Sequence, residues 1–105
     1  MKLYGDSRSG NCYKLKLTCS LLNITHDWVH VDILAGATRE ACFRALNPNG
    51  RIPVLQLSDG STLWESNAIL NYLARDSRLL PEDPLAFARV LQWQFFEQYS
   101  HEPYI

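Results

Sequence analysis

Two polar segments of the sequence combine residue types that could hold a small peptide-like anion. The first is the run 47–55, in which a turn is followed by Pro53 at the mouth of an apolar strand. Because proline lacks an N–H and forces the preceding residue to be extended, we expect Ile52 to keep backbone polar groups free of the sheet. The second is Glu65-Ser66, a carboxylate and a hydroxyl that open a helical pattern. Free backbone groups beside a helix N-terminus favour the binding of such an anion.

The elements that must position these segments alternate between strand and helix. The expected strands are 2–4, 28–31, 54–57 and 62–64, and the expected helices are 10–23, 38–46 and a third from 65 onward. Asp59-Gly60, between two apolar runs, is typical of a hairpin. The order is therefore βαβα, then a hairpin, then a helix, which places the chain in the α/β class.

The predictions of the first two helices depend on particular residues. The stretch 13–18 alternates apolar and polar residues as a strand does, but Tyr13, Leu17 and Leu21 recur at helical spacing, so we favour a helix that ends at Asn23. Thr38 is the expected N-cap of the second helix, because its hydroxyl can accept a bond from the first turn.

Beyond Arg78 the sequence changes character. Residues 79–84 are typical of a linker, with Asp83 as N-cap and Pro84 as the first residue of another helix. That helix is unusually aromatic, and little sequence follows for it to pack against. We therefore expect residues 1–78 to form one domain, and residues 79–105 to be a linker and the first helix of an all-α domain that these residues do not complete.

Composition argues against several classes of partner. The net charge is −1, from 10 basic and 11 acidic residues, and no long run of like charge occurs, which disfavours nucleic acid or an anionic membrane as the main partner. No apolar stretch approaches the roughly 18 residues of a membrane span.

The cysteines and histidines argue against a disulfide framework and against a metal site. The three cysteines are odd in number and widely spaced, so a disulfide framework is disfavoured. Without a signal-peptide pattern after Met1, we expect a cytoplasmic protein. The three histidines have no metal-ligand spacing, so no metal is expected.

Four pieces of the sequence, in order and in register, resemble the N-terminal, thioredoxin-like domain of cytosolic glutathione transferases. They are residues 2–5 (KLYG), Ser9, residues 47–55 (NPNGRIPVL) and residues 64–69 (WESNAI). The resemblance runs from Met1 to about Arg78, and the linker and aromatic helix continue it. It implies a βαβαββα domain with a mixed four-stranded sheet, in a serine-type protein similar to the bacterial theta, phi and nu classes.

The resemblance also implies glutathione-binding residues. In the family, the residue before a cis-proline offers its backbone to the cysteinyl part of glutathione, which corresponds here to Ile52 and Pro53. The acid–hydroxyl pair that binds the γ-glutamyl end corresponds to Glu65 and Ser66. The alternative is that Ser66 is only an N-cap and Glu65 an acid that complements the helix dipole.

Two arginines are candidates for the glycine carboxylate. Arg39, expected in the second helix, lies where several family members carry a basic residue for that carboxylate. Arg51, beside the proline, is the other candidate. Either arginine could instead be a solvated surface charge.

The resemblance implies a group that stabilises the glutathione thiolate. Ser9 lies where serine-type classes carry the hydroxyl, and Asn11 matches an asparagine used in some bacterial classes. Ser7 is a third option, and Tyr4 resembles the tyrosine of other classes only loosely. Cys12, about one turn into the helix, would instead support glutathione-dependent thiol–disulfide exchange, although no C-x-x-C motif accompanies it.

The function implied by the resemblance is that of a transferase. The domain would bind glutathione as co-substrate and activate its thiol for attack on a small electrophile. In the family, dimers form mainly between the N-terminal domain of one subunit and the helical domain of the other. The alternative from another class is a non-catalytic binding or assembly module built on the same domain.

Overall fold

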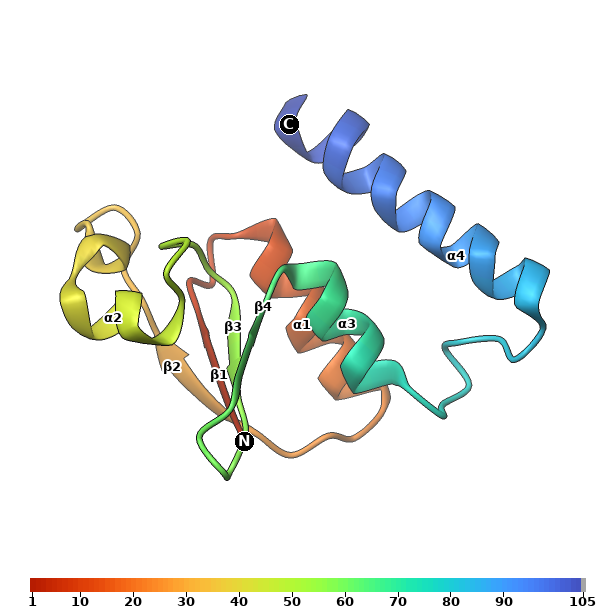
Figure 1. Ribbon diagram of the computed structural model, residues 1–105, viewed down its shortest axis with the longest axis horizontal. Helices are drawn as coiled ribbons and strands as arrows, with labels where there is room; N and C mark the ends of the chain where they lie inside the picture. The colour runs from red at the N-terminus through yellow and green to blue at the C-terminus, as the bar shows by residue number, and fades with distance from the viewer. Residues whose placement is uncertain (105) are drawn as a thin grey trace. The chain divides into compact units, whose positions relative to one another are not determined.

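A mixed four-stranded sheet organises the first part of the chain (Figure 1). The computed structural model describes residues 1–104, and its strands are β1 (Lys2–Gly5), β2 (Asp27–His30), β3 (Val54–Gln56) and β4 (Thr62–Trp64). The strand order is β2-β1-β3-β4, with β1 parallel to β2 and antiparallel to β3, and β3 antiparallel to β4. The predicted mixed four-stranded sheet is confirmed. Compared with the predicted bounds, β1 ends one residue later, β2 begins and ends one residue earlier, and β3 ends one residue earlier.

Three helices complete this part of the chain. They are α1 (Gly10–Leu21), α2 (Ala41–Leu46) and α3 (Ser66–Ala74). With the strands they give the order βαβαββα, which is the thioredoxin-like order that the sequence predicts.

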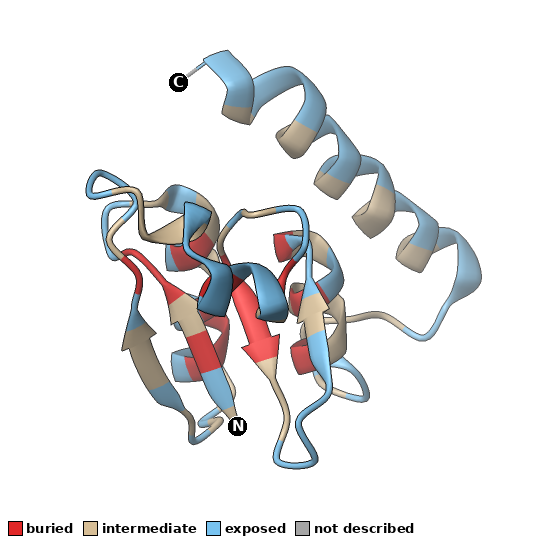
Figure 2. Ribbon diagram, turned by 60° about the vertical axis from the view of Figure 1, so that its left-hand side comes forward, coloured by how far each residue is buried: buried red, intermediate tan, exposed pale blue. Residues whose placement is uncertain are grey.

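Side chains from the sheet alternate between two apolar clusters. Leu3 and Leu55 pack against α1 and α3, in a cluster that also contains Leu15 and Ile69. The neighbouring residues on the strands contribute to a second cluster on the side of α2, made of Val31, Phe43 and Val54 with partly buried residues around them. Figure 2 shows the buried residues concentrated on β1, β3 and the three helices α1, α2 and α3. This alternation follows from the period of two in a strand, and it fixes α1 and α3 on the same face.

The boundaries of all three helices differ from the prediction, and α3 begins at Ser66, one residue later than predicted. Helix α1 ends at Leu21, and Asn23 adopts a φ of 55°, a left-handed conformation that asparagine tolerates and that cannot continue the helix. Thr38 is not the N-cap of α2. It lies in a separate 3₁₀ turn, Ala37–Arg39, and the extended Glu40 then takes the N-cap position without a side-chain bond. Gly36, at a φ of 78°, starts that turn early.

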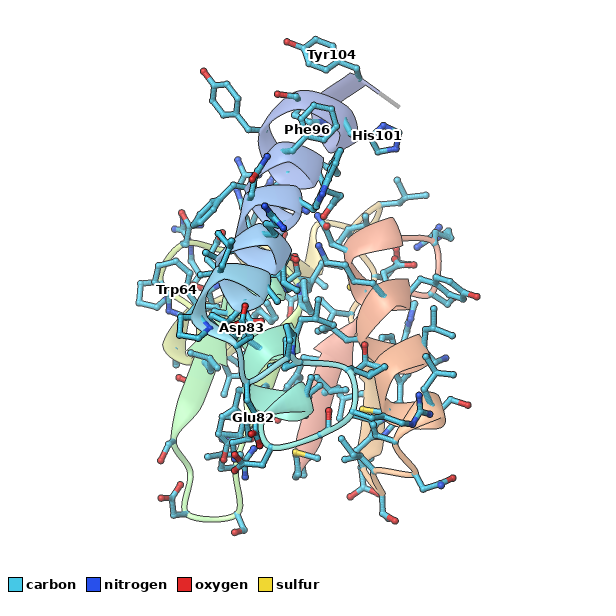
Figure 3. The ribbon with its side chains drawn as sticks, turned by 90° about the vertical axis from the view of Figure 1, so that its right-hand side faces the viewer. Trp64, Glu82, Asp83, Phe96, His101 and Tyr104 are labelled. Atoms are coloured by element: carbon cyan, nitrogen blue, oxygen red, sulfur yellow. The ribbon has the colours of Figure 1, made fainter. Side chains whose placement is uncertain are left out.

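The segment from Ala74 on forms a second unit by its contacts, and Met1–Leu73 forms the first. Its main helix is α4 (Pro84–Phe96), followed by a π-helical turn (Glu97–His101) and a 3₁₀ turn (Glu102–Tyr104). Asp83 caps α4 by accepting the Ala86 N–H at 2.9 Å, and Pro84 is the first helical residue, as predicted. Figure 3 shows Asp83 where α4 begins and Phe96 near its other end. The predicted domain boundary after residue 78 stays a prediction.

Within residues 1–104, no helix is long and apolar enough to cross a membrane.

Candidate functional site

The register of the sheet brings the polar segments of the sequence to one end of it. Tyr4 pairs with Val54, and Val54 pairs with Trp64. Because β1 and β4 both run antiparallel to β3, the end of β1, the start of β3 and the end of β4 lie at the same edge. The segments attached there are the loop that carries Ser9, the residues before Val54, and Glu65.

At this edge, Ser9 forms the N-cap of α1. Its Oγ accepts the Cys12 N–H at 3.3 Å, and its own N–H donates to the Asp6 carbonyl at 3.0 Å. The Ser9 side chain also hydrogen-bonds with the Cys12 thiol, which partly opposes the rise in the pKa of that thiol. A ligand sulfur at this end of α1 would compete with Cys12 for the hydroxyl proton. The side chain is half-buried, so a ligand at the end of α1 can reach it.

The N-terminus of α3 meets the N-terminus of α1. Ser66 is the first residue of α3 and is only 6% exposed, and its hydroxyl donates to Asn11 Oδ1 at 3.4 Å. Ser66 is therefore inside the helix, and the N-cap position is that of Glu65. Each helix N-terminus carries a partial positive charge and unpaired N–H groups, so two of them together favour an anion.

Glu65 has a strained backbone. Its φ is 76°, and the other described non-glycine residues with positive φ are Asn23 and Asp76, whose types tolerate that conformation. For a glutamate the conformation costs on the order of 1–3 kcal/mol, and such strain tends to occur at functional sites. The Glu65 side chain is exposed, and no residue within 1–104 binds its carboxylate.

The loop before β3 is held by a buried asparagine. Asn47 is 1% exposed; its Nδ2 donates to the Arg51 carbonyl at 2.8 Å and its Oδ1 accepts the Asn49 N–H at 2.9 Å. The Ile52–Pro53 peptide bond is cis, as the resemblance implied. Among the described residues, none forms a hydrogen bond with the backbone of Ile52. Its N–H and C=O are thus available to a peptide-like ligand, as the sequence predicts.

Both candidate arginines are exposed and have no acidic partner within residues 1–104. Arg39 lies in the 3₁₀ turn before α2, which corrects its predicted place inside the second helix. A Cβ added to Gly50 would lie 3.4 Å from the Thr38 carbonyl oxygen, so this turn and the loop that contains Arg51 run against each other. The two guanidinium groups therefore come from adjacent segments.

The alternatives to Ser9 are less well placed. Cys12 is fully buried, and burial raises the pKa of its thiol, so it stays protonated at neutral pH. The Tyr4 side chain packs with the cluster on the α2 side, where its hydroxyl donates to Gln56 Oε1 at 2.8 Å. Ser7 is exposed in the turn after Asp6.

The sequence did not single out Asp6 or Arg8. Asp6 is fully buried at the start of the loop that carries Ser9, and it accepts bonds from Arg8 Nε at 2.8 Å, Arg8 Nη2 at 2.6 Å and the Arg8 N–H at 2.9 Å. These bonds from Arg8 hold the pKa of the Asp6 carboxyl well below its usual range. The signal available in the sequence was an acid directly after a strand with an arginine two positions later.

A separate cavity of about 450 Å³ lies between α2 and the sheet. Tyr4, Phe43 and Gln56 are among its lining residues, and none of the candidate site residues is. This cavity is therefore separate from the candidate site at the N-termini of α1 and α3. In the described part of the chain, no three or more His, Cys, Asp or Glu side chains form a group that could hold a metal ion.

Comparison with known proteins decides the family. The family model described as "Glutathione S-transferase, N-terminal domain" matches residues 8–76, a stretch that contains Ser9, Ile52, Pro53, Glu65 and Ser66. The chain belongs to the glutathione S-transferase family. A curated relative, the maleylacetoacetate isomerase of Pseudomonas aeruginosa, is 36% identical over 94 residues, which are 85% of this chain and 44% of the relative.

Solved structures of the glutathione S-transferase family are similar over nearly the whole chain. A glutathione S-transferase from Pseudomonas fluorescens Pf-5 is 63% identical with a TM-score of 0.97, over 99% of this chain and 52% of that one. A maleylacetoacetate isomerase from Methylobacterium extorquens AM1, solved with bound malonate and GSH, is 36% identical with a TM-score of 0.83, over 90% of this chain and 46% of that one. The chain thus spans about half the length of these relatives.

Proposed function

We propose that this chain binds glutathione at the joined N-termini of α1 and α3 and stabilises its thiolate for attack on a small electrophile. The observation that carries the proposal is the meeting of Ser9, Asn11 and Ser66 at one end of the sheet, linked by the bond from Ser66 to Asn11 at 3.4 Å. The family, and the GSH bound in the relative from Methylobacterium extorquens, support it.

The peptide part of glutathione is bound by three groups. Its cysteinyl backbone pairs with the free N–H and C=O of Ile52, next to Pro53. Its γ-glutamyl carboxylate accepts a bond from the Ser66 N–H, and a second from the Ser66 hydroxyl when that hydroxyl turns from Asn11 Oδ1 to the ligand. Its ammonium group pairs with Glu65. The contacts with Ser66 and Glu65 involve charged groups of the ligand, so they are stronger than the neutral backbone pairing with Ile52.

The glycine carboxylate is bound by a guanidinium group. Arg39 and Arg51 lie on adjacent segments and have no acidic partner among the described residues, so each can pair with a carboxylate. An arginine suits this role because its planar group matches the two carboxylate oxygens.

The chemical step needs the glutathione thiol in its ionised form. A free thiol has a pKa of about 8.5, so only a few per cent is thiolate at neutral pH. Lowering that pKa by about two units takes roughly 2.7 kcal/mol of selective stabilisation of the thiolate. The Ser9 hydroxyl, assisted by Asn11 and the α1 dipole, supplies donors for the sulfur. The thiol proton leaves to solvent, the sulfur lone pair forms the bond to the electrophilic carbon, and the leaving group departs with its electron pair.

The wider setting is also a proposal. We propose a cytoplasmic protein of a serine-type class that acts as a homodimer, in which a helical domain continuing from α4 binds the electrophile. Residues 1–78 would then be the glutathione-binding domain, and residues 79–105 the linker and first helix of the helical domain.

Calorimetry of glutathione binding tests the proposal directly. Ser66→Ala should weaken binding by about 1–2 kcal/mol, because a charged group loses one donor. Glu65→Gln should also weaken it, because the ammonium group loses its counter-charge. Ser58→Ala, at an exposed serine in the hairpin, is the matched control and should bind as the wild type does.

Two results would contradict the proposal. Unchanged dissociation constants in both Ser66→Ala and Glu65→Gln would show that the γ-glutamyl end binds elsewhere. No measurable binding by the wild-type chain would favour the non-catalytic binding or assembly module.

A further inference from the structure

A charged bridge joins two loops at the site end of the sheet. Arg8 Nη2 lies 2.6 Å from Asp6 Oδ2 and 2.9 Å from Asp32 Oδ1. Asp6 belongs to the loop between β1 and α1, and Asp32 belongs to the loop after β2. Since β1 and β2 are parallel neighbours, both loops leave the same edge of the sheet.

Each end of the bridge organises its own loop. Asp6 is fully buried and also accepts the Ile33 N–H at 3.4 Å, and its carbonyl accepts the N–H of Ser9 at 3.0 Å. Asp32 Oδ1 accepts the N–H groups of Leu34 at 3.0 Å and Ala35 at 3.2 Å, which shapes the segment leading to the 3₁₀ turn with Arg39.

The two loops carry the groups proposed for two different parts of glutathione. The first presents Ser9 to the thiol, and the second leads to Arg39, a candidate for the glycine carboxylate. We propose, on the basis of the function proposed above, that Arg8 is a positioning residue which couples thiol activation to recognition of the glycine carboxylate through its bridge between Asp6 and Asp32.

Arginine suits this role for geometric reasons. The forked guanidinium group donates to both oxygens of Asp6 and, from Nη2, to Asp32 as well. A lysine ammonium in the same place is a point charge on a flexible stem and cannot reproduce the fixed fork. The bridge is also asymmetric: Asp6 is buried, whereas the Arg8 and Asp32 side chains are 49% and 46% exposed, so the Asp32 contact can be weakened without leaving a buried charge unpaired.

The test uses residues 1–105, two ligands and two measurements. The ligands are glutathione and γ-glutamylcysteine, which lacks the glycine carboxylate. Calorimetry gives the dissociation constants, and the ultraviolet band of the thiolate gives the pKa of the bound thiol. Far-ultraviolet circular dichroism and thermal melting establish whether each variant is folded.

Arg8→Gln should weaken glutathione binding by about tenfold and move the pKa of the bound thiol back towards that of a free thiol. Arg8→Lys should not restore wild-type behaviour, because the fork is lost. Arg89→Gln, at an exposed arginine of α4, is the matched control and should leave both quantities unchanged.

Asp32→Asn is the milder variant and keeps the inference testable if Arg8→Gln does not fold. Asparagine retains Oδ1 as an acceptor for Leu34 and Ala35, so chiefly the ionic contact with Arg8 is weakened. It should weaken binding of glutathione more than binding of γ-glutamylcysteine, because its loop leads to the site for the glycine carboxylate.

Three outcomes would overturn the inference. Wild-type binding and thiol pKa in a folded Arg8→Gln variant would show that the bridge positions nothing. Wild-type values of both quantities in Arg8→Lys would show that Arg8 acts by its charge alone. Weakened glutathione binding in Arg8→Gln with no change in Asp32→Asn would show that Arg8 acts without Asp32. In each of these cases the proposed function would still hold if the wild-type protein binds glutathione and lowers the pKa of its thiol. If the wild-type protein does not bind glutathione, both the proposed function and this inference are overturned.

Discussion

Ser9 combines two hydrogen-bonding tasks in one hydroxyl group. The oxygen accepts the Cys12 N–H at 3.3 Å, which caps α1, and the side chain also hydrogen-bonds with the Cys12 thiol. In the proposed function, the hydroxyl proton is donated to the glutathione sulfur instead. A hydroxyl is suited to this because it donates and accepts at once. Cys12, although close in sequence, has neither the exposure nor the lowered pKa that a nucleophile needs.

The buried carboxylate of Asp6 should give the chain a specific dependence on pH. The folded state lowers its pKa, chiefly through the hydrogen bonds from the Arg8 side chain, relative to about 3.9 in an unfolded chain. The stabilising contribution is therefore fully present above about pH 4 and is lost as the pH falls towards the lower pKa of the folded state. The free energy of unfolding of the wild type, measured in urea from neutral pH to about pH 2, should fall more steeply than that of Asp6→Asn. Parallel curves for the two proteins would contradict this.

At the scale of elements, β1 ends in a glycine because two neighbouring elements approach it closely. A Cβ on Gly5 would lie 2.8 Å from Cys12 Sγ on α1 and 2.8 Å from Trp28 Cη2 on β2. Such a distance is shorter than any ordinary contact, so a methyl group would push apart the elements that position Ser9.

We expect Gly5→Ala to destabilise the chain by about 1–3 kcal/mol, as overpacking of a core does. The free energy of unfolding in urea measures this. Gly10→Ala is the control, because a Cβ there has nothing within 4 Å, and its stability should equal or slightly exceed that of the wild type. Equal stability of Gly5→Ala and the wild type would show that α1 and Trp28 shift without cost.

The start of a helix was predictable where the residues at that position determine it by themselves. Asp83 and Pro84 start α4 as their types predict, because an N-cap acceptor and a proline at the first position need no tertiary partner. Thr38 was placed wrongly because a left-handed Gly36 begins a 3₁₀ turn before the helix, and glycine permits that conformation without requiring it.

The site was predictable in its residue types and less so in its geometry. A proline after Ile52 indicates in the sequence itself that backbone groups stay free. The bond between Ser66 and Asn11 joins residues 55 positions apart, which no local pattern shows. Nor does any pattern indicate a φ of 76° at Glu65, since glutamate has no preference for that conformation. The partners of Asp6 likewise depend on how β1 and β2 pair.

At the scale of the whole molecule, α4 and the π-helical turn that follows it carry large apolar side chains that are exposed. Trp93, Phe95, Phe96 and Tyr99 are 65%, 72%, 52% and 84% exposed, and the rings of Trp93 and Phe96 lie edge to face with centroids 5.5 Å apart. Burying one large apolar side chain is worth roughly 1.5–3 kcal/mol of free energy, which each exposed side chain does not gain. A contiguous group of them is an association surface.

We therefore expect this chain to associate with itself through α4. Sedimentation should show a mass that rises with concentration, and the double variant Trp93→Gln, Phe96→Gln should shift the chain towards the monomer. Tyr13→Gln, at a residue of α1 that is 60% exposed, is the control and should associate as the wild type does. A wild type that stays monomeric at all concentrations would contradict this expectation.

The central claim is that Ser9 stabilises the thiolate of bound glutathione, and titration of the thiolate ultraviolet band tests it most directly. With saturating protein, the bound thiol of the wild type should ionise about two pH units below a free thiol, whose pKa is about 8.5. Ser9→Ala should return the pKa most of the way to that value, and Cys12→Ala should leave it as in the wild type. A lowered pKa that persists in Ser9→Ala, or one that is lost in Cys12→Ala, would contradict the account.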